Sequence, residues 1–238
     1  PKTHNKVLMR PGKLSIWTGW SRHGKTQMLK QVMLHGIGQS ERVLFCSMEE
    51  EVHEVWKDMA WVGCGRADPD PREIDRFVAF VTRKLYLFDQ QGTVSPKKVV
   101  ALVRYAAAEL GITHVVVDSL MMLALGREDY EGQARFVGEL KTAAKDSGCH
   151  VHLVAHMRKR DGKTGEEAPG TLHDIMGGHE LGSIADNVFV VWRDRERKDP
   201  SKPDVILKVE KQRGRVNWTG TIGLNTHAVS RQFVESIY

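Results

Sequence analysis

The sequence predicts an α/β fold with a mostly parallel central sheet flanked by helices and with antiparallel strands at its C-terminal edge. Two observations lead to this prediction. Short apolar runs alternate with longer segments of helical period, which is the pattern of strand–helix–strand units around a parallel sheet. The chain has 238 residues, of which 41% are hydrophobic, and this length suits one large core better than two. We therefore expect a single domain over residues 1–238.

The predicted strands are short apolar runs bounded by glycine, proline or polar residues. The first precedes a glycine-rich turn, and the last ones are expected at the antiparallel edge of the sheet. In chain order they cover 14–18, 43–46, 85–88, 115–117, 151–155, 187–192, 205–209 and 219–224.

The predicted helices carry apolar residues at spacings of three and four. The first covers 25–37 and ends in a pair of glycines, and the second begins near Glu50. The third follows Ser95 and Pro96, which supply an N-cap and a first-turn proline, and it runs to Leu110.

The fourth predicted helix covers roughly 131–147 and is closed by Gly148. Two segments rich in glycine, proline and charge have no periodicity. We interpret 62–72 as a loop or broken turn, and 157–178 as a long, mobile loop of the kind that often carries function.

Composition restricts the class of protein. The formal net charge of +5, from 35 Lys and Arg against 30 Asp and Glu, allows a polyanionic partner but is a mild excess. The 3 cysteines are widely separated without a CxxC pair, which indicates neither a disulfide framework nor a zinc site. No apolar run approaches the roughly 18 residues of a membrane span, so a soluble cytosolic protein is expected. A chain that starts at Pro1 without Met also looks like part of a longer protein.

A phosphate-binding pattern lies between the first predicted strand and helix. The match to G-x-x-x-x-G-K-[ST] is complete and consists of Gly19, Trp20, Ser21, Arg22, His23, Gly24, Lys25 and Thr26. Its glycines let backbone N–H groups and the helix N-terminus face nucleotide phosphates. We expect Lys25 to reach the β- and γ-phosphates, Thr26 to bind Mg²⁺, and Gln27 to belong to the same site.

A triphosphate site also needs a carboxylate for its metal ion. Asp118 ends the apolar run 115–117 and is the candidate, together with Thr26. The alternative is an ordinary strand-terminal or N-cap aspartate, and the neighbouring phosphate loop favours the metal role.

Hydrolysis needs a group that orients or deprotonates the attacking water. The strand 43–46 delivers an acidic segment to the edge of the sheet where ligands bind in open α/β folds. Glu49 comes first after the strand and is the candidate. Glu50 and Glu51 can instead be first-turn acids favoured by the helix dipole.

The order and content of these pieces resemble the motor domain of hexameric replicative DNA helicases, the DnaB-like, RecA-type group, and most closely its phage primase-helicase and Twinkle-type members. The resemblance covers residues 14–224. The matching segments are TGWSRHGKT, SMEE, VVVDS, ELKTAAKDSG, VAHMRK, GGHELGSIADNVFVVWRD and KQR. It implies a RecA-like P-loop NTPase fold and an ATP-dependent DNA helicase that uses ATP or another NTP with Mg²⁺. Such a motor translocates on single-stranded DNA and unwinds duplex 5′ to 3′.

The resemblance also implies roles for individual residues. Glu49 and Lys25 take the catalytic positions, and His156 senses the γ-phosphate. The alternative for His156 is a half-buried histidine at a strand end, and the neighbouring motifs favour the sensor role. Arg213 is the best match to an arginine finger that enters the neighbouring subunit's site in trans, with Lys211 beside it. Arg215 lies close enough in sequence to compete for the finger role.

The segment after His156 corresponds to the loop that grips single-stranded DNA in this family. Its cations Arg158, Lys159, Arg160 and Lys163 are predicted to contact phosphates without base specificity. The alternative is a solvated surface run that nearby acids partly neutralise.

Partners follow from the same resemblance. A homo-hexamer of the full-length protein, single-stranded DNA and a primase domain or protein are implied, and no membrane. The sequence departs from the family at Ser183, where a Gln three residues before the motif aspartate, here Asp186, is common. No primase module or ring-forming linker helix is apparent, so the isolated chain could be monomeric. A RecA-like recombinase or accessory DNA-dependent ATPase is the alternative, and a degenerate nucleotide-binding module is a third.

Overall fold

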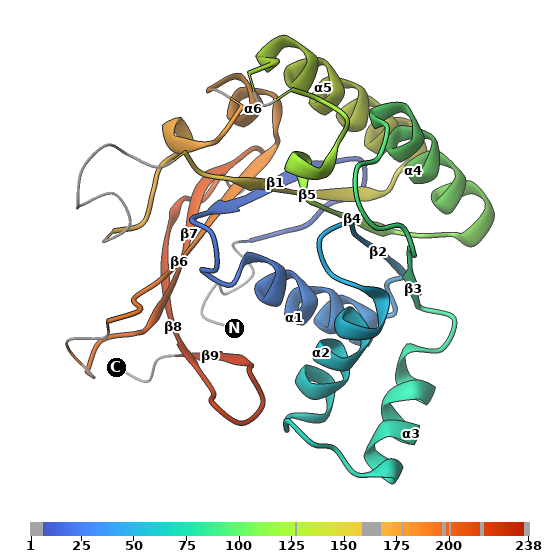
Figure 1. The fold of residues 1–238 in the computed structure, drawn as a ribbon, viewed down its shortest axis with the longest axis vertical. Coiled ribbons are helices and arrows are strands. Elements are labelled where there is room, and N and C mark those ends of the chain that lie inside the picture. Colours follow the sequence, from blue (N-terminus) through green and yellow to red (C-terminus); the bar gives the residue numbers. More distant parts are fainter. Residues whose placement is uncertain are drawn as a thin grey trace.

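The computed structural model describes residues 7–126, 128–158, 168–177, 179–196, 199, 201–214 and 217–235. Within these ranges the chain forms a 9-stranded sheet with helices on both faces (Figure 1). The strands are β1 (Leu14–Gly19), β2 (Val43–Ser47), β3 (Leu85–Leu87), β4 (His114–Asp118), β5 (His150–His156), β6 (Asn187–Arg193), β7 (Val205–Gln212), β8 (Gly220–Thr226) and β9 (Phe233–Glu235). The helices are α1 (Lys25–Gly38), α2 (Val52–Cys64), α3 (Pro71–Val81), α4 (Pro96–Leu110), α5 (Tyr130–Ser147) and α6 (His179–Ile184), with short 3₁₀ helices η1 (Leu120–Met122) and η2 (Leu172–Asp174).

The strand order is β3-β2-β4-β5-β1-β6-β7-β8-β9. The strands from β3 to β6 pair in parallel, and those from β6 to β9 pair antiparallel. The predicted α/β fold with an antiparallel C-terminal edge is therefore confirmed. Parallel strands covered on both faces are mainly apolar, and the centre of the buried β4, residues 115–117, consists of three valines.

Two apolar cores lie on opposite faces of the sheet. Helices α4, α5 and α6 cover one face, and α1, α2 and α3 cover the other (Figure 1). Alternation along β4 sends Val115 and Val117 into the first core and Val116 into the second. No helix in the described ranges is long and apolar enough to cross a membrane.

The predicted loop over 62–72 is wrong at both ends. Helix α2 continues to Cys64, and α3 already begins at Pro71. Asp70 caps α3, since its Oδ1 accepts from the backbone N–H groups of Arg72 (2.8 Å) and Glu73 (3.0 Å), and Glu73 Oε2 accepts from the Asp70 N–H (2.8 Å). This reciprocal capping box and the first-turn proline start a helix where composition alone suggested a loop.

The predicted loop 157–178 is structured in its described part. Met157 forms a β-bridge with Ile175, and η2 lies just before this bridge. Residues 159–167 are outside the described ranges.

Three histidines form a buried polar cluster within the sheet. Trp17 Nε1 donates to His152 Nδ1 (3.1 Å), so the proton of His152 lies on Nε2 and is donated to His114 Nδ1 (3.0 Å). His150 Nδ1 donates to the Arg10 carbonyl (2.7 Å). Burial lowers the pKa of all three imidazoles, that of His150 to about 3. The three imidazoles are therefore neutral in the folded protein at neutral pH.

Candidate functional site

The candidate site forms where parallel strands end. Strand β1 ends at Gly19, opposite His156 at the end of β5, and Ser47 at the end of β2 lies opposite Asp118 at the end of β4. Because these strands run in parallel, their carboxyl ends share one edge of the sheet. The predicted loop, acid and histidine are thus delivered to the same edge.

Two glycines shape the turn between β1 and α1. A Cβ on Gly19 would lie 2.2 Å from the Val191 carbonyl oxygen, and Gly24 has a left-handed φ of 90°. Helix α1 then begins at Lys25, and its N-cap Gly24 offers no side chain to the first N–H groups. These orphan donors and the helix dipole make the turn suited to an anion.

Lys25 lies folded over this turn. It is 5% exposed, and its Nζ donates to the carbonyl oxygens of Gly19 (3.1 Å) and Trp20 (2.9 Å). Burial lowers the pKa of Lys25 to about 8, although the carboxylates of Asp118 and Glu49 oppose this shift. An anionic ligand in the turn would supply the negative charge that the ammonium lacks.

Thr26 and Asp118 form an oxygen pair beside the lysine. Thr26 Oγ1 donates to Asp118 Oδ2 at 2.6 Å, and Asp118 is almost fully buried. Burial raises the pKa of Asp118 to about 6, against the opposing effect of the Thr26 bond. A hydroxyl and a carboxylate are hard oxygen donors of the kind that Mg²⁺ prefers, so this pair fits the metal expected with a triphosphate.

Glu49 follows β2 and faces the same space. Its Oε1 accepts a hydrogen bond from Ser119 Oγ and lies 3.4 Å from His156 Nε2. The contact with His156 is the largest influence on Glu49 and lowers its pKa, while burial acts in the opposite sense. The structure therefore brings Glu49, His156, Lys25 and Asp118 together, and it adds Ser119, for which the sequence carries no signal beyond its place after Asp118.

Other residues of the predicted loop hold its frame. Trp20 is buried, and its indole Nε1 donates to the Ala168 carbonyl (3.3 Å); His23 is buried and its Nδ1 accepts from the Arg193 N–H (3.0 Å). Ser21 and Arg22 are exposed at the tip of the turn. The side chains of Trp20 and His23 therefore attach the turn to residues 168 and 193.

Gln27 lies on α1 and reaches the hairpin between β8 and β9. Its Nε2 donates to the Arg231 carbonyl (3.1 Å), and Phe233 of β9 approaches Gly24 closely enough that a Cβ there would lie 3.1 Å from the ring. The C-terminal hairpin therefore packs against the start of α1.

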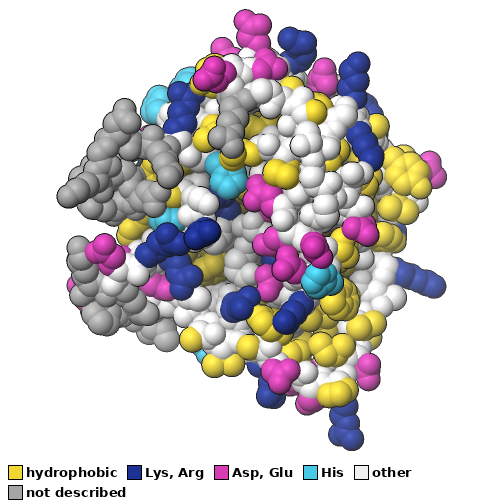
Figure 2. Space-filling view, in the orientation of Figure 1, with side chains coloured by type: hydrophobic (Ala, Val, Ile, Leu, Met, Phe, Trp, Pro, Cys, Tyr) yellow, Lys and Arg dark blue, Asp and Glu magenta, His cyan; other side chains and the backbone are white. Residues whose placement is uncertain are grey.

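Of the predicted DNA contacts, only Arg158 lies in the described ranges. Its N–H donates to the Asp174 carbonyl (2.9 Å), and its guanidinium lies 5.1 Å from the centroid of the exposed Tyr130 ring. Lys159, Arg160 and Lys163 lie outside the described residues. Figure 2 shows acidic and basic side chains interspersed over one face of the molecule, in keeping with the mild net charge.

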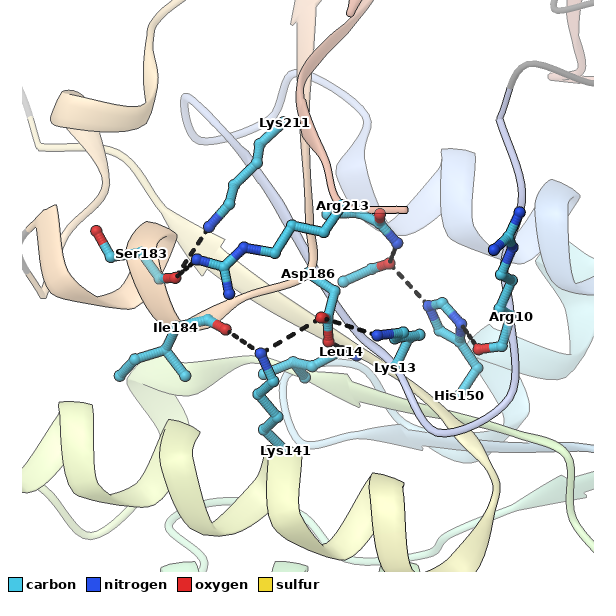
Figure 3. A network of polar contacts seen from close by, with 12 residues as sticks. Arg10, Lys13, Leu14, Lys141, His150, Ser183, Ile184, Asp186, Lys211 and Arg213 are labelled. Atoms are coloured by element: carbon cyan, nitrogen blue, oxygen red, sulfur yellow. Dashed lines mark hydrogen bonds and ion pairs between the residues drawn. The ribbon is translucent and has the colours of Figure 1, made fainter. Parts of the chain in front are cut away.

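Lys211 and Arg213 occupy a different edge of the sheet. Lys211 Nζ donates to the carbonyls of Gly182 (2.7 Å) and Ser183 (2.9 Å), and Arg213 Nη2 donates to that of Ser183 (3.0 Å), at the C-terminal end of α6 (Figure 3). Burial, followed by the nearby Arg213 charge, lowers the pKa of Lys211 to about 8. At Ser183, where the sequence departs from the family, both cations therefore bind the backbone carbonyl and not the side chain.

Strand register shows how far these cations are from the loop. Gln212 pairs with Asn187, and Asn187 pairs with Ser15 at the start of β1, whereas the phosphate loop follows Gly19 at its end. Lys211 and Arg213 are therefore not assembled with Lys25 within one chain. Arg215, the competing finger, lies outside the described residues.

Asp186 anchors the region beside them. Its Oδ2 accepts from the Leu14 N–H (3.1 Å), and its Oδ1 pairs with Lys13 and Lys141, both at 3.3 Å (Figure 3). This motif aspartate therefore fixes the start of β1 against α5.

A phosphate-binding turn between a parallel strand and a helix, with a lysine, a hydroxyl–carboxylate pair and a strand-end glutamate around it, defines a P-loop nucleoside triphosphatase domain. The chain belongs to the AAA domain family, whose model matches residues 4–162.

Two solved structures share its fold. One is an ATPase domain, which matches with a TM-score of 0.80 at 17% identity, over 95% of this chain and 85% of that one. The other is a DnaB-like replicative helicase, described with its interactions with primase. It matches with a TM-score of 0.78 at 16% identity, over 95% of this chain and 58% of the helicase chain. The RecA-like fold expected from the sequence is confirmed.

Proposed function

We propose that this domain is the motor of an ATP-dependent replicative DNA helicase, which hydrolyses ATP to translocate on single-stranded DNA and unwind duplex 5′ to 3′. The observation that carries the proposal is the assembly of Lys25, Thr26, Asp118 and Glu49 at one sheet edge. The fold shared with the ATPase domain and the DnaB-like replicative helicase supports the helicase class.

Each residue has a role that its surroundings support. Lys25 would exchange the carbonyls of Gly19 and Trp20 for phosphate oxygens. Thr26 and Asp118 would hold Mg²⁺, which supplies charge neutralisation for the triphosphate. Glu49 has a lowered pKa and is therefore ionised at neutral pH, as a group that orients and deprotonates water must be.

His156 supplies a link between hydrolysis and movement. It faces Glu49 at 3.4 Å and lies one residue before Met157, which bridges Ile175, and two before Arg158. A hydrogen bond from His156 to the γ-phosphate would end when that phosphate leaves, and the change would pass directly to the segment proposed to hold DNA. Arg158, Lys159, Arg160 and Lys163 are proposed to contact the phosphate backbone of the strand.

Assembly completes the site in this proposal. Arg213 and Lys211 lie at the edge opposite the phosphate loop, which suits groups that act on a neighbouring subunit's nucleotide. We therefore propose a homo-hexamer in the full-length protein, working in the cytosol with single-stranded DNA and a primase.

Three measurements on one preparation test the proposal. They are ATP turnover with and without single-stranded DNA, unwinding of a forked duplex, and mass in solution. DNA-stimulated turnover, unwinding and a hexameric mass are expected. Turnover with stoichiometric coating of the strand and no unwinding would instead identify a recombinase-like ATPase.

A mixing experiment tests the finger. Lys25→Ala and Arg213→Ala are each expected to be inactive alone. In mixed rings, some Arg213→Ala subunits, which keep the phosphate loop, would lie next to Lys25→Ala subunits, which keep the arginine. Partial ATP turnover should therefore return. A mixture as inactive as its components, at a ring mass equal to wild type, would remove Arg213 from the neighbour's site.

A further inference from the structure

A buried lysine lies on α1 one helical turn beyond the phosphate loop. The side chain of Lys30 is 1% exposed, and lysine is almost never found so deeply buried unless it is paired. Its Nζ donates to Glu50 Oε2 at 2.5 Å and to Asp58 Oδ2 at 2.8 Å. Two carboxylates from separate segments therefore converge on one ammonium.

The position of Lys30 on the helix relates it to the metal pair. Thr26 and Lys30 are four residues apart, so they lie on the same side of α1. Thr26 holds Asp118 at the end of β4, and Lys30 holds Glu50 just after β2, the neighbouring strand. One helix face thus fixes the ends of two adjacent strands.

The segment that carries Glu49 is held on both sides of this residue. The Met48 N–H donates to the Asp118 carbonyl (2.7 Å), and the Glu50 N–H donates to Ser47 Oγ (3.0 Å). Gln91 Nε2 donates to the Glu50 carbonyl (2.9 Å). Lys30 adds a charged contact to the Glu50 side chain, whereas the Glu49 carboxylate turns toward the site.

The outer half of the network reaches another element. Asp58 on α2 also pairs through Oδ1 with Arg231 Nη1 at 3.0 Å, in the hairpin between β8 and β9. Asp58, the outer carboxylate, therefore serves the packing of the hairpin. Glu50, the inner carboxylate, is the partner of Lys30 next to the reacting centre. The two carboxylates can be replaced separately.

We propose that Lys30 is a positioning residue for ATP hydrolysis, holding Glu50 so that the adjacent Glu49 carboxylate faces the attacking water. This inference rests on the proposed function. If the salt bridges of Lys30 served stability alone, loss of Glu50 and loss of Asp58 would affect the rate of ATP hydrolysis alike. The geometry predicts that only the loss of Glu50 lowers this rate.

Three variants test the assignment. Glu50→Gln removes the inner charge, Lys30→Met removes the ammonium at similar length, and Asp58→Asn removes the charge of the outer carboxylate as a matched control. For Glu50→Gln and Lys30→Met we expect kcat for ATP to fall at least about tenfold, with the affinity for a non-hydrolysable ATP analogue nearly unchanged. Asp58→Asn should lower Tm but keep kcat.

A fourth comparison isolates the route through Glu49. In a Glu49→Gln background, Glu50→Gln should cause no further loss of the residual rate, because both changes disable the same group. If Lys30→Met fails to fold, Glu50→Gln carries the test, since Asp58 still pairs with Lys30 there.

The outcomes separate the two proposals. A wild-type protein without ATP turnover overturns the proposed function and this inference with it. A wild-type protein that turns over ATP, with a folded Glu50→Gln variant of equal kcat, overturns the inference alone. So does an Asp58→Asn variant that loses as much kcat as Glu50→Gln.

Discussion

The Thr26 hydroxyl donates a 2.6 Å hydrogen bond to the buried Asp118 carboxylate, and this bond joins the start of α1 to the end of β4. Burial raises the pKa of Asp118 from 3.8 to about 6. Because the folded-state pKa is above the unfolded value, ionising Asp118 destabilises the nucleotide-free fold. This penalty is absent below pH 3.8, grows as the pH rises through this window, and is complete above pH 6.

Replacing Asp118 with asparagine should therefore stabilise the nucleotide-free protein above pH 6 while it abolishes Mg²⁺-dependent ATP turnover. Asparagine can still accept from Thr26, and it removes the buried charge. Tm should rise by several degrees at pH 8, at about 2–4 °C for each kcal/mol, and by less at pH 5. Differential scanning calorimetry at both pH values measures this, and a Tm at pH 8 below wild type would contradict the burial argument.

Replacing Glu49 with glutamine should separate binding from turnover. The amide keeps the size of the side chain and loses the base, so ATP hydrolysis should fall by roughly 10²–10⁴ while nucleotide affinity is retained. Steady-state turnover and equilibrium titration on the same sample measure the two. Hydrolysis at the parent rate would remove Glu49 from the catalytic residues.

Neutralising Arg158 and Lys159 together should weaken single-stranded DNA binding evenly across sequences. Each phosphate contact contributes a slope of about −0.7 to log K against log salt, so the double variant should flatten the slope by roughly 1.4. The matched control is Arg83 with Lys84, an equal change in charge at the opposite end of the sheet, just before β3. An unchanged slope in the Arg158 and Lys159 variant would exclude this loop from the interface.

The sequence predicted the strands β1 to β8, the antiparallel edge and the candidate residues of the phosphate site because each has a local signal. The short β9 and α6 were not predicted. Apolar runs mark the strands, and the loop motif fixes Lys25 and Thr26 directly. Helix α3 also had a local signal, in the Asp70 and Glu73 capping box beside Pro71, but the glycines and charges before it outweighed this signal.

What could not be predicted are contacts between residues distant in sequence. The bond from Ser119 to Glu49 and the pairing of Lys30 with Glu50 depend on strand order, which no local pattern encodes. The alternative interpretation of Glu50 as a first-turn acid of α2 is wrong, since α2 begins at Val52 and Glu50 pairs with Lys30. The sequence analysis identified Lys211 and Arg213 as candidate residues, but it did not predict their contacts with the end of α6.

The histidine cluster should make the fold sensitive to acid. Folded-state pKa values below 6.5 mean that protons bind preferentially to the unfolded chain, so the contribution of the cluster to stability is constant above about pH 6.5 and declines below it. Each neutral histidine contributes about 1.4 kcal/mol per pH unit below its unfolded pKa. Denaturant unfolding between pH 7.5 and 5.5 measures the decline. His150→Gln should reduce its slope, and a slope equal to wild type would contradict the account of the cluster.

Equilibrium titration of a non-hydrolysable ATP analogue with Mg²⁺ into wild type and Lys25→Ala tests the central claim, that the turn after β1 holds a nucleotide triphosphate. Wild type should bind one analogue per chain, and the variant should bind about a hundredfold more weakly, since two charge-assisted contacts are lost. Because the pKa of Lys25 is about 8 without nucleotide, wild-type affinity should also fall as the pH rises above 8. Lys84→Ala is the control and should bind as wild type does. Equal affinities for wild type and Lys25→Ala would contradict the account.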